Sequence, residues 1–189
     1  PSSTLFPYTT LFRSVAPESQ SERRCERCRS VRLHFETVIP LASYQGDLRT
    51  AVLRMKRAAG EPLSRAMGDF LATKKRGMLA AVEADVVVPI PMYWGRRLLR
   101  GTNSPEILAR RLSRRLAIPA EPRLLVRRRN TLLQPDLPPR ERFRNIQGAF
   151  RVDKGYDLGG ARVLVVDDVL TTGATCSEAA KSLKQAGAA

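Results

Sequence analysis

The stretch RVLVVDDVLTTGATC, residues 162–176, decides how the fold of this chain is interpreted. Its four apolar residues, 163–166, are typical of a β-strand in a protein core. Asp167 and Asp168 follow this strand directly, and a threonine-rich turn then leads into a segment with helical character. Because ligands bind beyond the carboxyl ends of the strands in open parallel sheets, we expect the two acids and the turn to form a ligand site.

The chemistry of the turn indicates which ligand fits. The first N–H groups of the following helix have no intrahelical acceptors and carry the positive end of the helix dipole. With the threonine hydroxyls they can hold a phosphate monoester, and a glycine lets the backbone turn tightly. The carboxylates of Asp167 and Asp168 can accept hydrogen bonds from a diol, so the segment predicts a site for ribose 5-phosphate. The residues that we assign to the phosphate are Thr171, Thr172, Gly173, Ala174 and Thr175. The alternative is an ordinary strand–turn–helix with incidental acids.

The rest of the sequence alternates between strand and helix patterns. Strands are expected at residues 36–44, 85–91, 123–126, 148–152 and 162–168, and helices at 47–60, 62–71, 104–116 and 176–187. Residues 127–147 form a long polar segment with prolines, and loops of this length are usually functional or disordered. Strands that alternate with helices predict an α/β fold with a doubly wound, mostly parallel sheet.

Arginines are concentrated in the second half of the chain. Residues 96–151 contain fifteen arginines and four acids, a local net charge of +11 within a total of +15. This concentration favours a polyanionic partner, either nucleic acid or a phosphorylated small molecule. The alternative is a compositional preference for arginine, with 27 arginines against 6 lysines, although that preference does not explain the scarcity of acids.

Composition also argues against several function classes. No run of 18 apolar residues is present, so no membrane span is expected. His34 is the single histidine, which argues against a hydrolase with a Ser-His-Asp or Cys-His site. Two of the three cysteines form a C-x-x-C motif, which suits a reduced cytosol, and no secretion signal is visible, so we expect a cytoplasmic protein. Cys176, at the start of the last helix, is expected to be packed or, with a pKa lowered by the helix N-terminus, reactive.

The residues also carry a resemblance to a known family. Thirteen consecutive positions, 163–175, match the phosphoribosyl pyrophosphate motif of type I phosphoribosyltransferases. The segments CERC, VLRMKRAAG, VPIP, LLRGTN and RRRNTLLQPDLPPRERFRNIQGAF accompany this motif in the order seen in the competence-associated ComF proteins. The resemblance covers residues 25–189. Thr102 and Ser104 depart from it, because a Phe and a Gln usually flank the asparagine at Asn103.

The resemblance implies a fold, a ligand and site residues. It implies a type I phosphoribosyltransferase domain that binds phosphoribosyl pyrophosphate with Mg²⁺, with the ribose on Asp167 and Asp168 and the 5-phosphate on residues 171–175. The loop after VPIP corresponds to the pyrophosphate loop, whose candidate residues are Arg96, Arg97 and Arg100. A solvated basic helix edge is the alternative there. Residues 127–147 match the mobile hood over the site, whose candidate residues are Arg140, Arg142 and Arg144. Lys56 matches a basic position of the family to which we assign no role.

Two functions are compatible with this resemblance. One is enzymatic transfer of ribose phosphate, a pentosyl glycosyltransferase reaction, to an unidentified nitrogenous acceptor. The other is non-catalytic handling of single-stranded DNA during DNA uptake in natural transformation, with the competence helicase machinery as a further partner. The arginines support electrostatic contact with DNA, but the absence of an aromatic stripe weakens a base-stacking platform.

Three segments divide the chain. Residues 1–14 include TLFPYTTLFRS, which resembles a translated sequencing-library adapter, so we expect no domain there; the alternative is an amphipathic β-segment at residues 5–12. Residues 15–33 resemble part of a zinc ribbon, in which Cys25 and Cys28 supply two of the four ligands that Zn²⁺ needs; a redox-active pair is the alternative. Residues 34–189 are expected to form the phosphoribosyltransferase-like domain, truncated at its C-terminal end.

Overall fold

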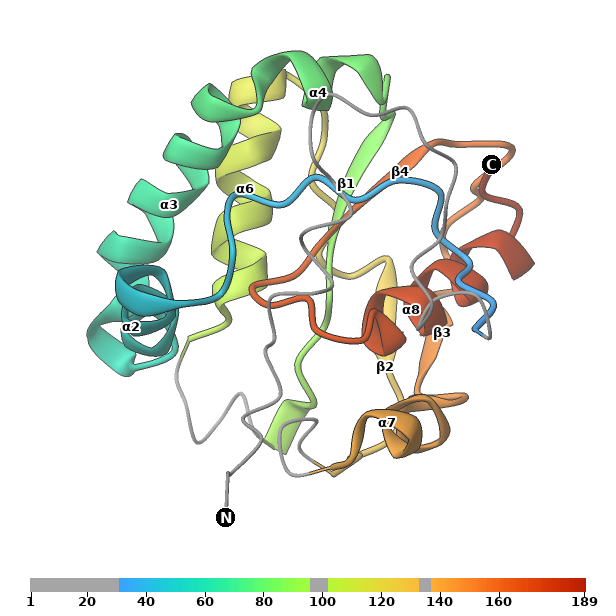
Figure 1. Cartoon of the computed structure of the whole chain (residues 1–189). Helices are drawn as coiled ribbons and strands as arrows, with labels where there is room; N and C mark the ends of the chain where they lie inside the picture. The colour runs from blue at the N-terminus through green and yellow to red at the C-terminus, as the bar shows by residue number, and fades with distance from the viewer. Residues whose placement is uncertain (1–30, 96–101, 133–136) are drawn as a thin grey trace.

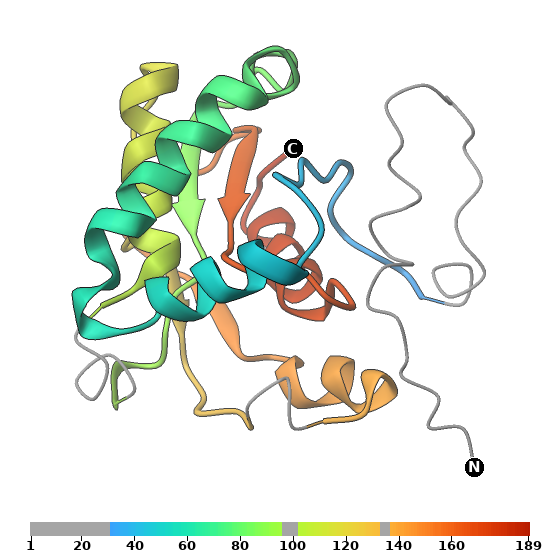
Figure 2. The same cartoon turned by 60° about the vertical axis from the view of Figure 1, so that its left-hand side comes forward.

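Two parallel strands lie at the centre of the molecule, with helices on both sides of them (Figure 1). The structure is a computed structural model, and it describes residues 31–95, 102–132 and 137–189. In chain order the elements are α2 (Gly46–Met55), η2 (Ala58–Gly60), α3 (Glu61–Lys74), α4 (Arg76–Ala81), β1 (Val86–Pro89), α6 (Ser104–Leu116), β2 (Leu125–Arg127), α7 (Pro139–Ile146), β3 (Phe150–Val152), β4 (Val163–Val166) and α8 (Ala174–Gln185). Helices α3 and α6 lie on one side of the β1–β4 pair and α8 lies on the other (Figure 2).

Strand β1 is buried along its whole length, as its continuous apolar pattern predicts. Val87 packs into the cluster that α2, α3 and α6 form on one face, together with Leu108 and Leu112. Val86 and Val88 point to the other face, where Leu183 of α8 belongs to the same cluster. This alternation explains why an apolar run without polar interruptions forms the central strand.

The sheet is smaller and more mixed than the sequence predicts. Strands β1 and β4 are parallel, in a register that pairs Val86 with Val163 and Pro89 with Val166. A single parallel bridge joins Val87 to Ala120 on the other edge of β1. Strands β2 and β3 pair antiparallel as a separate two-stranded sheet. The described residues therefore confirm an α/β arrangement with a small parallel sheet, whereas the expectation that the sheet is mostly parallel is wrong for β2 and β3.

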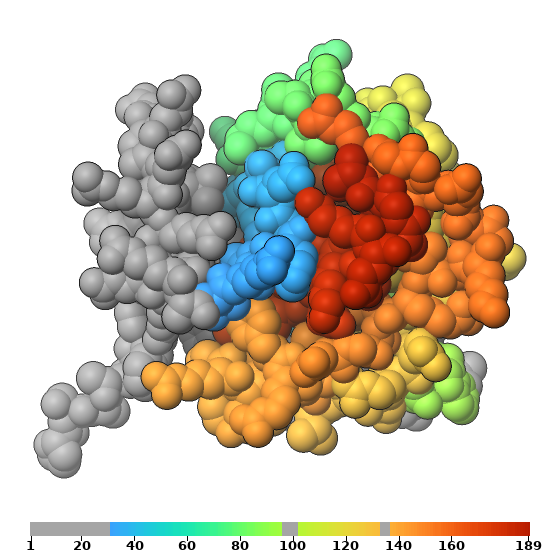
Figure 3. All heavy atoms as spheres, turned by 90° about the vertical axis from the view of Figure 1, so that its right-hand side faces the viewer, coloured from blue at the N-terminus to red at the C-terminus, as the bar shows by residue number. Residues whose placement is uncertain are grey.

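The prediction of a strand at residues 36–44 is wrong. Residues 31–45 contain no strand, and this segment instead lies against α8, where the N-terminal part of the described chain meets the C-terminal part (Figure 3). Its contacts are made by side chains, since Glu36 pairs with Lys184 of α8 at 2.9 Å. Side-chain anchoring of this kind replaces the backbone pairing that a sheet requires.

Helix boundaries also differ from the expectations. The helix expected at residues 47–60 ends at Met55 and is followed by the short η2 turn, and the helix expected at 62–71 continues to Lys74. The long segment 127–147 contains α7, which begins with Pro139 and buries Ile146 against the core. In the parts of the chain that the structure describes, no helix has both the length and the apolar character to cross a bilayer.

Candidate ligand-binding site

The two acids lie at the carboxyl end of the parallel pair, as predicted. The N–H of Ile90 donates to the carbonyl oxygen of Val166 at 2.8 Å, so the β1–β4 pairing continues up to the residue that precedes Asp167. The backbone N–H of Asp168 then donates to Oδ1 of Asp167 at 2.8 Å. Both carboxyls are partly buried, at the edge where open parallel sheets bind ligands.

Asp167 lies in surroundings that disfavour its charge. Burial and, next, the charge of Asp168 raise the pKa of Asp167 to about 7. Sγ of Cys176, on the first turn of α8, lies 4.0 Å from Oδ2 of Asp167. Burial and the charge of Asp167 raise the pKa of the Cys176 thiol well above its ordinary value, so this cysteine is packed as predicted and the helix N-terminus does not make it a thiolate.

Asp168 has a basic partner that the sequence did not assign. Lys56, at the C-terminal end of α2, places Nζ 3.1 Å from Oδ1 of Asp168, and the two side chains are 32% and 12% exposed. Helix α2 passes beyond the carboxyl ends of β1 and β4 (Figure 2), which brings Lys56 to the acids. After Lys56 the chain folds back on the end of α2 at Gly60. Only glycine fits at this position, because a Cβ would clash with the carbonyl oxygens of Arg54 and Met55.

The turn that follows the acids has the backbone conformation that its glycine predicts. Gly173 has φ +77° and precedes α8, and its carbonyl oxygen accepts from the N–H of Ser177 at 2.8 Å. Oγ1 of Thr172 accepts from the N–H of Ala174 at 3.4 Å. The N–H groups of the first turn of α8 have no acceptors within the helix, so Thr171 to Thr175 present donors at a helix N-terminus. We call residues 167–175 the acid–threonine turn.

Arg142 of α7 contacts the acid–threonine turn at Thr171, whereas Lys56 contacts it at Asp168. Nη1 of Arg142 donates to Oγ1 of Thr171 at 3.0 Å, and its Nε donates to the carbonyl oxygen of Leu137 at 3.0 Å. Arg142 is 4% exposed, and among the described residues no carboxylate pairs with it. A buried guanidinium whose partners are neutral oxygens is costly without an anion, so the described residues place two acids and one cation without a carboxylate partner at this site.

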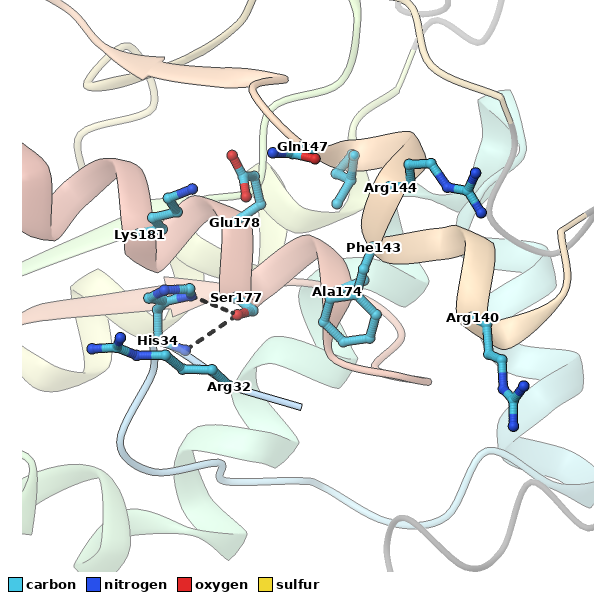
Figure 4. A pocket seen from close by; sticks show the side chains of 11 residues that line it. Arg32, His34, Arg140, Phe143, Arg144, Gln147, Ala174, Ser177, Glu178 and Lys181 are labelled. Atoms are coloured by element: carbon cyan, nitrogen blue, oxygen red, sulfur yellow. Dashed lines mark hydrogen bonds between the residues drawn. The ribbon is translucent and has the colours of Figure 1, made fainter. Parts of the chain in front are cut away.

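The three hood arginines do not act together. Arg142 faces the acid–threonine turn, whereas Arg140 and Arg144 lie one helical turn apart on another face of α7 and line a separate pocket (Figure 4). This pocket lies between α7, α8 and the N-terminal segment, and we call it the α7–α8 groove. It has a volume of about 340 Å³, and its charged or titratable lining residues are Arg32, His34, Arg140, Arg144, Glu178 and Lys181.

Several predicted residues lie outside the part of the chain that the structure describes. Among them are the pyrophosphate-loop candidates Arg96, Arg97 and Arg100. The zinc candidates Cys25 and Cys28 also lie outside it. Their assignment therefore stays a prediction.

Mg²⁺ is the metal that the resemblance implies at the acids. In the described ranges no group of three or more His, Cys, Asp and Glu side chains gathers as a metal site. Two neighbouring carboxylates nevertheless fit Mg²⁺, which is commonly held by one or two carboxylates together with substrate phosphates. Asp167 and Asp168 are therefore the residues that would hold it.

Residues of the N-terminal segment complete the surroundings of the turn, and no pattern in the sequence pointed to them. A Cβ at Gly173 would lie 3.3 Å from Cζ of Phe35, so the segment packs directly on the turn. The N–H of His34 donates to Oγ of Ser177 at 3.1 Å, and Nδ1 of His34 lies 3.1 Å from the same oxygen. His34 is therefore a hydrogen-bonded residue that holds the segment on α8.

Comparison with known proteins gives relatives over most of the chain. DNA utilization protein YhgH of Escherichia coli (strain K12) is 29% identical over 176 residues, which are 92% of this chain and 77% of the relative. Competence protein F of Haemophilus influenzae is 29% identical over 172 residues, 87% of this chain and 74% of the relative. No family model matches the chain, and no solved structure matches it significantly. The relatives and the order of the motifs agree, and together they support the assignment of the chain to the ComF family of competence-associated proteins.

Proposed function

We propose that this chain binds phosphoribosyl pyrophosphate, together with Mg²⁺, at the acid–threonine turn. The observation that supports the proposal most is Arg142, a buried guanidinium that contacts the hydroxyl of Thr171 and has no carboxylate partner in the described structure. A phosphate held by the first N–H groups of α8 would lie beside this guanidinium and neutralise it. The buried cation is therefore explained by an anionic ligand at the turn.

Each residue of the turn then has a distinct role. The N–H groups and hydroxyls of residues 171–175 bind the 5-phosphate, and Gly173 supplies the φ of +77° that aims them at it. Asp167 and Asp168 accept hydrogen bonds from the ribose hydroxyls. Lys56 neutralises Asp168 when no sugar is bound and is close enough to contact the ligand when one is. Mg²⁺ would neutralise the diphosphate, for which Arg96, Arg97 and Arg100 are the cationic candidates.

The proposed fold is the type I phosphoribosyltransferase fold, with a zinc-ribbon remnant around Cys25 and Cys28. The parallel β1–β4 pair, its helices on both faces and the acids at its carboxyl edge support this assignment. In the enzymatic form of the proposal, the bond from the ribose anomeric carbon to pyrophosphate breaks and a bond to a nitrogen of the acceptor forms. Positioning and charge neutralisation would supply most of the rate enhancement. A cytoplasmic location suits this substrate.

Replacement of Arg142 tests the proposal. Arg142→Met is expected to weaken binding of phosphoribosyl pyrophosphate by about tenfold to a hundredfold in calorimetry with Mg²⁺, the range for hydrogen bonds to charged groups. The melting temperature of the ligand-free variant should stay the same or rise, because an uncompensated buried charge has been removed.

Arg111→Met is the matched control. Arg111 is a partly buried arginine on α6, but it pairs with Asp69, away from the turn. Its replacement should lower the melting temperature and leave the ligand affinity unchanged. Unchanged affinity in Arg142→Met, or a large loss of its stability, would contradict the proposal and indicate that Arg142 is structural.

A second candidate function is the handling of single-stranded DNA. The relatives are named for DNA utilization and competence, and the arginine-rich part of the chain supplies Arg140 and Arg144 to the cationic α7–α8 groove. We propose this role beside the first, since one chain can bind phosphoribosyl pyrophosphate at the turn and DNA elsewhere. Fluorescence anisotropy with a labelled single-stranded oligonucleotide tests it, and absence of salt-dependent binding would contradict it.

A further inference from the structure

The α7–α8 groove is lined by cations from three separate parts of the chain. Arg140 and Arg144 project from α7, Lys181 from α8, and Arg32 from the segment that precedes His34 (Figure 4). We infer that this groove is the surface that binds the phosphate backbone of single-stranded DNA. The inference rests on the proposed DNA-handling role and names its site, which adjoins the acid–threonine turn at Ala174.

The charges of the groove are available to a ligand. Within residues 31–95, 102–132 and 137–189, no acid forms an ion pair with Arg32, Arg140, Arg144 or Lys181. By contrast, most exposed arginines of α3 and α6 have acidic partners, as Arg65 has Glu61 and Arg110 has Glu106. The one acid of the groove, Glu178, already accepts a hydrogen bond from the N–H of Gly148 at 2.7 Å. The groove therefore carries a net positive charge, with four cations against the single acid Glu178, and no ion pair among the described residues neutralises the four cations.

The shape of the groove favours a flexible strand. Its volume of about 340 Å³ lies at the lower end of the range for small-ligand sites and is enough for roughly one nucleotide. Phe143 is partly exposed and lines the groove beside the cations, so a sugar or base can contact it while phosphates contact the arginines. The backbone of a single strand can bend into such a concave site, whereas the two strands of a stiff duplex hold their nucleotides outside it.

Helix α7 contributes arginines both to this groove and to the surroundings of the acid–threonine turn, and the two sites adjoin at Ala174, which lines the groove. Residues two apart on a helix point in nearly opposite directions, so Arg142 reaches Thr171 while Arg140 and Arg144 line the rim of the groove. The groove also differs in its exposure, since Arg140 and Arg144 are exposed and Arg142 is buried. One helix thus presents arginines to two different anion sites, one enclosed and one open.

The test is fluorescence anisotropy with labelled thymidylate oligonucleotides of increasing length, without Mg²⁺ or phosphoribosyl pyrophosphate. The double variant Arg140→Gln with Arg144→Gln should lower the affinity at low salt by about tenfold or more. It should also flatten the slope of log K against log[salt] by about 1.4, which is about 0.7 for each phosphate that the variant no longer neutralises. A second double variant, Arg32→Gln with Lys181→Gln, removes the same charge from the other walls of the groove. It should also lower the affinity and flatten the slope.

The control is Arg110→Gln with Arg114→Gln, an arginine pair at the same spacing on α6. It removes the same net charge and should change affinity and slope little. Equal effects of the control and the groove variants would overturn the inference, as would a duplex that binds more tightly than the single strand. A mononucleotide that binds as tightly as the longest oligonucleotide would also overturn it, since the groove would then be a small-phosphate site. Because the probe is DNA alone, failure of phosphoribosyl pyrophosphate binding would not change these results.

Discussion

The acid–threonine turn and the α7–α8 groove are the two sites at which we propose that anions bind, and they differ in how much their residues destabilise the unliganded fold. The turn holds a partly buried carboxyl with a raised pKa, a glycine with positive φ and a buried arginine without a carboxylate partner among the described residues. The arginines of the groove are exposed to solvent. Residues that destabilise the fold in this way cluster at sites that bind a ligand tightly in one geometry. An exposed cationic surface suits weaker and more adaptable binding.

The largest difference in stability is expected at Asp167. Its pKa is raised in the folded state to about 7, so the folded protein binds a proton that the unfolded chain has already lost between about pH 4 and 7. The stabilisation from this proton is complete below about pH 4 and is lost as the pH rises through 7. Asp167→Asn, which stays neutral, should therefore be more stable than the wild type at pH 8, by up to about 4 kcal/mol, and the difference should shrink to less than half of this at pH 5.

Urea denaturation at several pH values between 5 and 8 measures this effect. Asp157→Asn is the matched control, because Oδ1 of Asp157 likewise accepts from a backbone N–H, that of Gly159 at 3.1 Å, but the residue is exposed. The control should follow the wild type at each pH. If Asp167→Asn shows the same pH dependence of the free energy of unfolding as the wild type, the charge of Asp167 does not destabilise the folded protein.

A smaller loss is expected from the turn's glycine. Gly173→Ala forces φ +77° on a residue with a Cβ and brings that Cβ to 3.3 Å from Phe35. Gly160→Ala likewise forces a residue with a Cβ into the left-handed region, at φ +85°, but that Cβ would have no neighbour within 4 Å. We expect Gly160→Ala to lower the free energy of unfolding by about 1 kcal/mol and Gly173→Ala by about 2 kcal/mol. Equal losses would mean that the N-terminal segment does not pack on the turn in solution.

The same contrast explains which features the sequence predicted. The turn is local: a strand, two acids, a glycine and the following helix are consecutive, and each has a physical reason to lie where it does. The structure accordingly places Asp167, Asp168 and residues 171–175 together as expected. The groove is formed by residues up to about 150 positions apart, such as Arg32 and Lys181, and no local pattern links them.

The errors have a similar origin. Residues 36–44 have a strand-like composition, but their place against α8 is decided by contacts such as Glu36 with Lys184, which are remote in sequence. The antiparallel pairing of β2 with β3 follows from the way the chain returns through α7, which the polar composition of 127–147 did not indicate. The role of Lys56 could not be predicted for the same reason, since its partner Asp168 lies more than a hundred residues away.

The most direct test of the central claim is calorimetric titration of the wild-type chain and Asp168→Asn with phosphoribosyl pyrophosphate, with and without Mg²⁺. Asp168 would accept from the ribose and help to hold Mg²⁺, and its carboxylate now contacts Lys56 at 3.1 Å. We expect saturable, Mg²⁺-dependent binding by the wild type and none by Asp168→Asn, while circular dichroism shows both to be folded. Binding of equal affinity by the two proteins, or no binding by the folded wild type, would contradict the assignment of the acid–threonine turn as the phosphoribosyl pyrophosphate site.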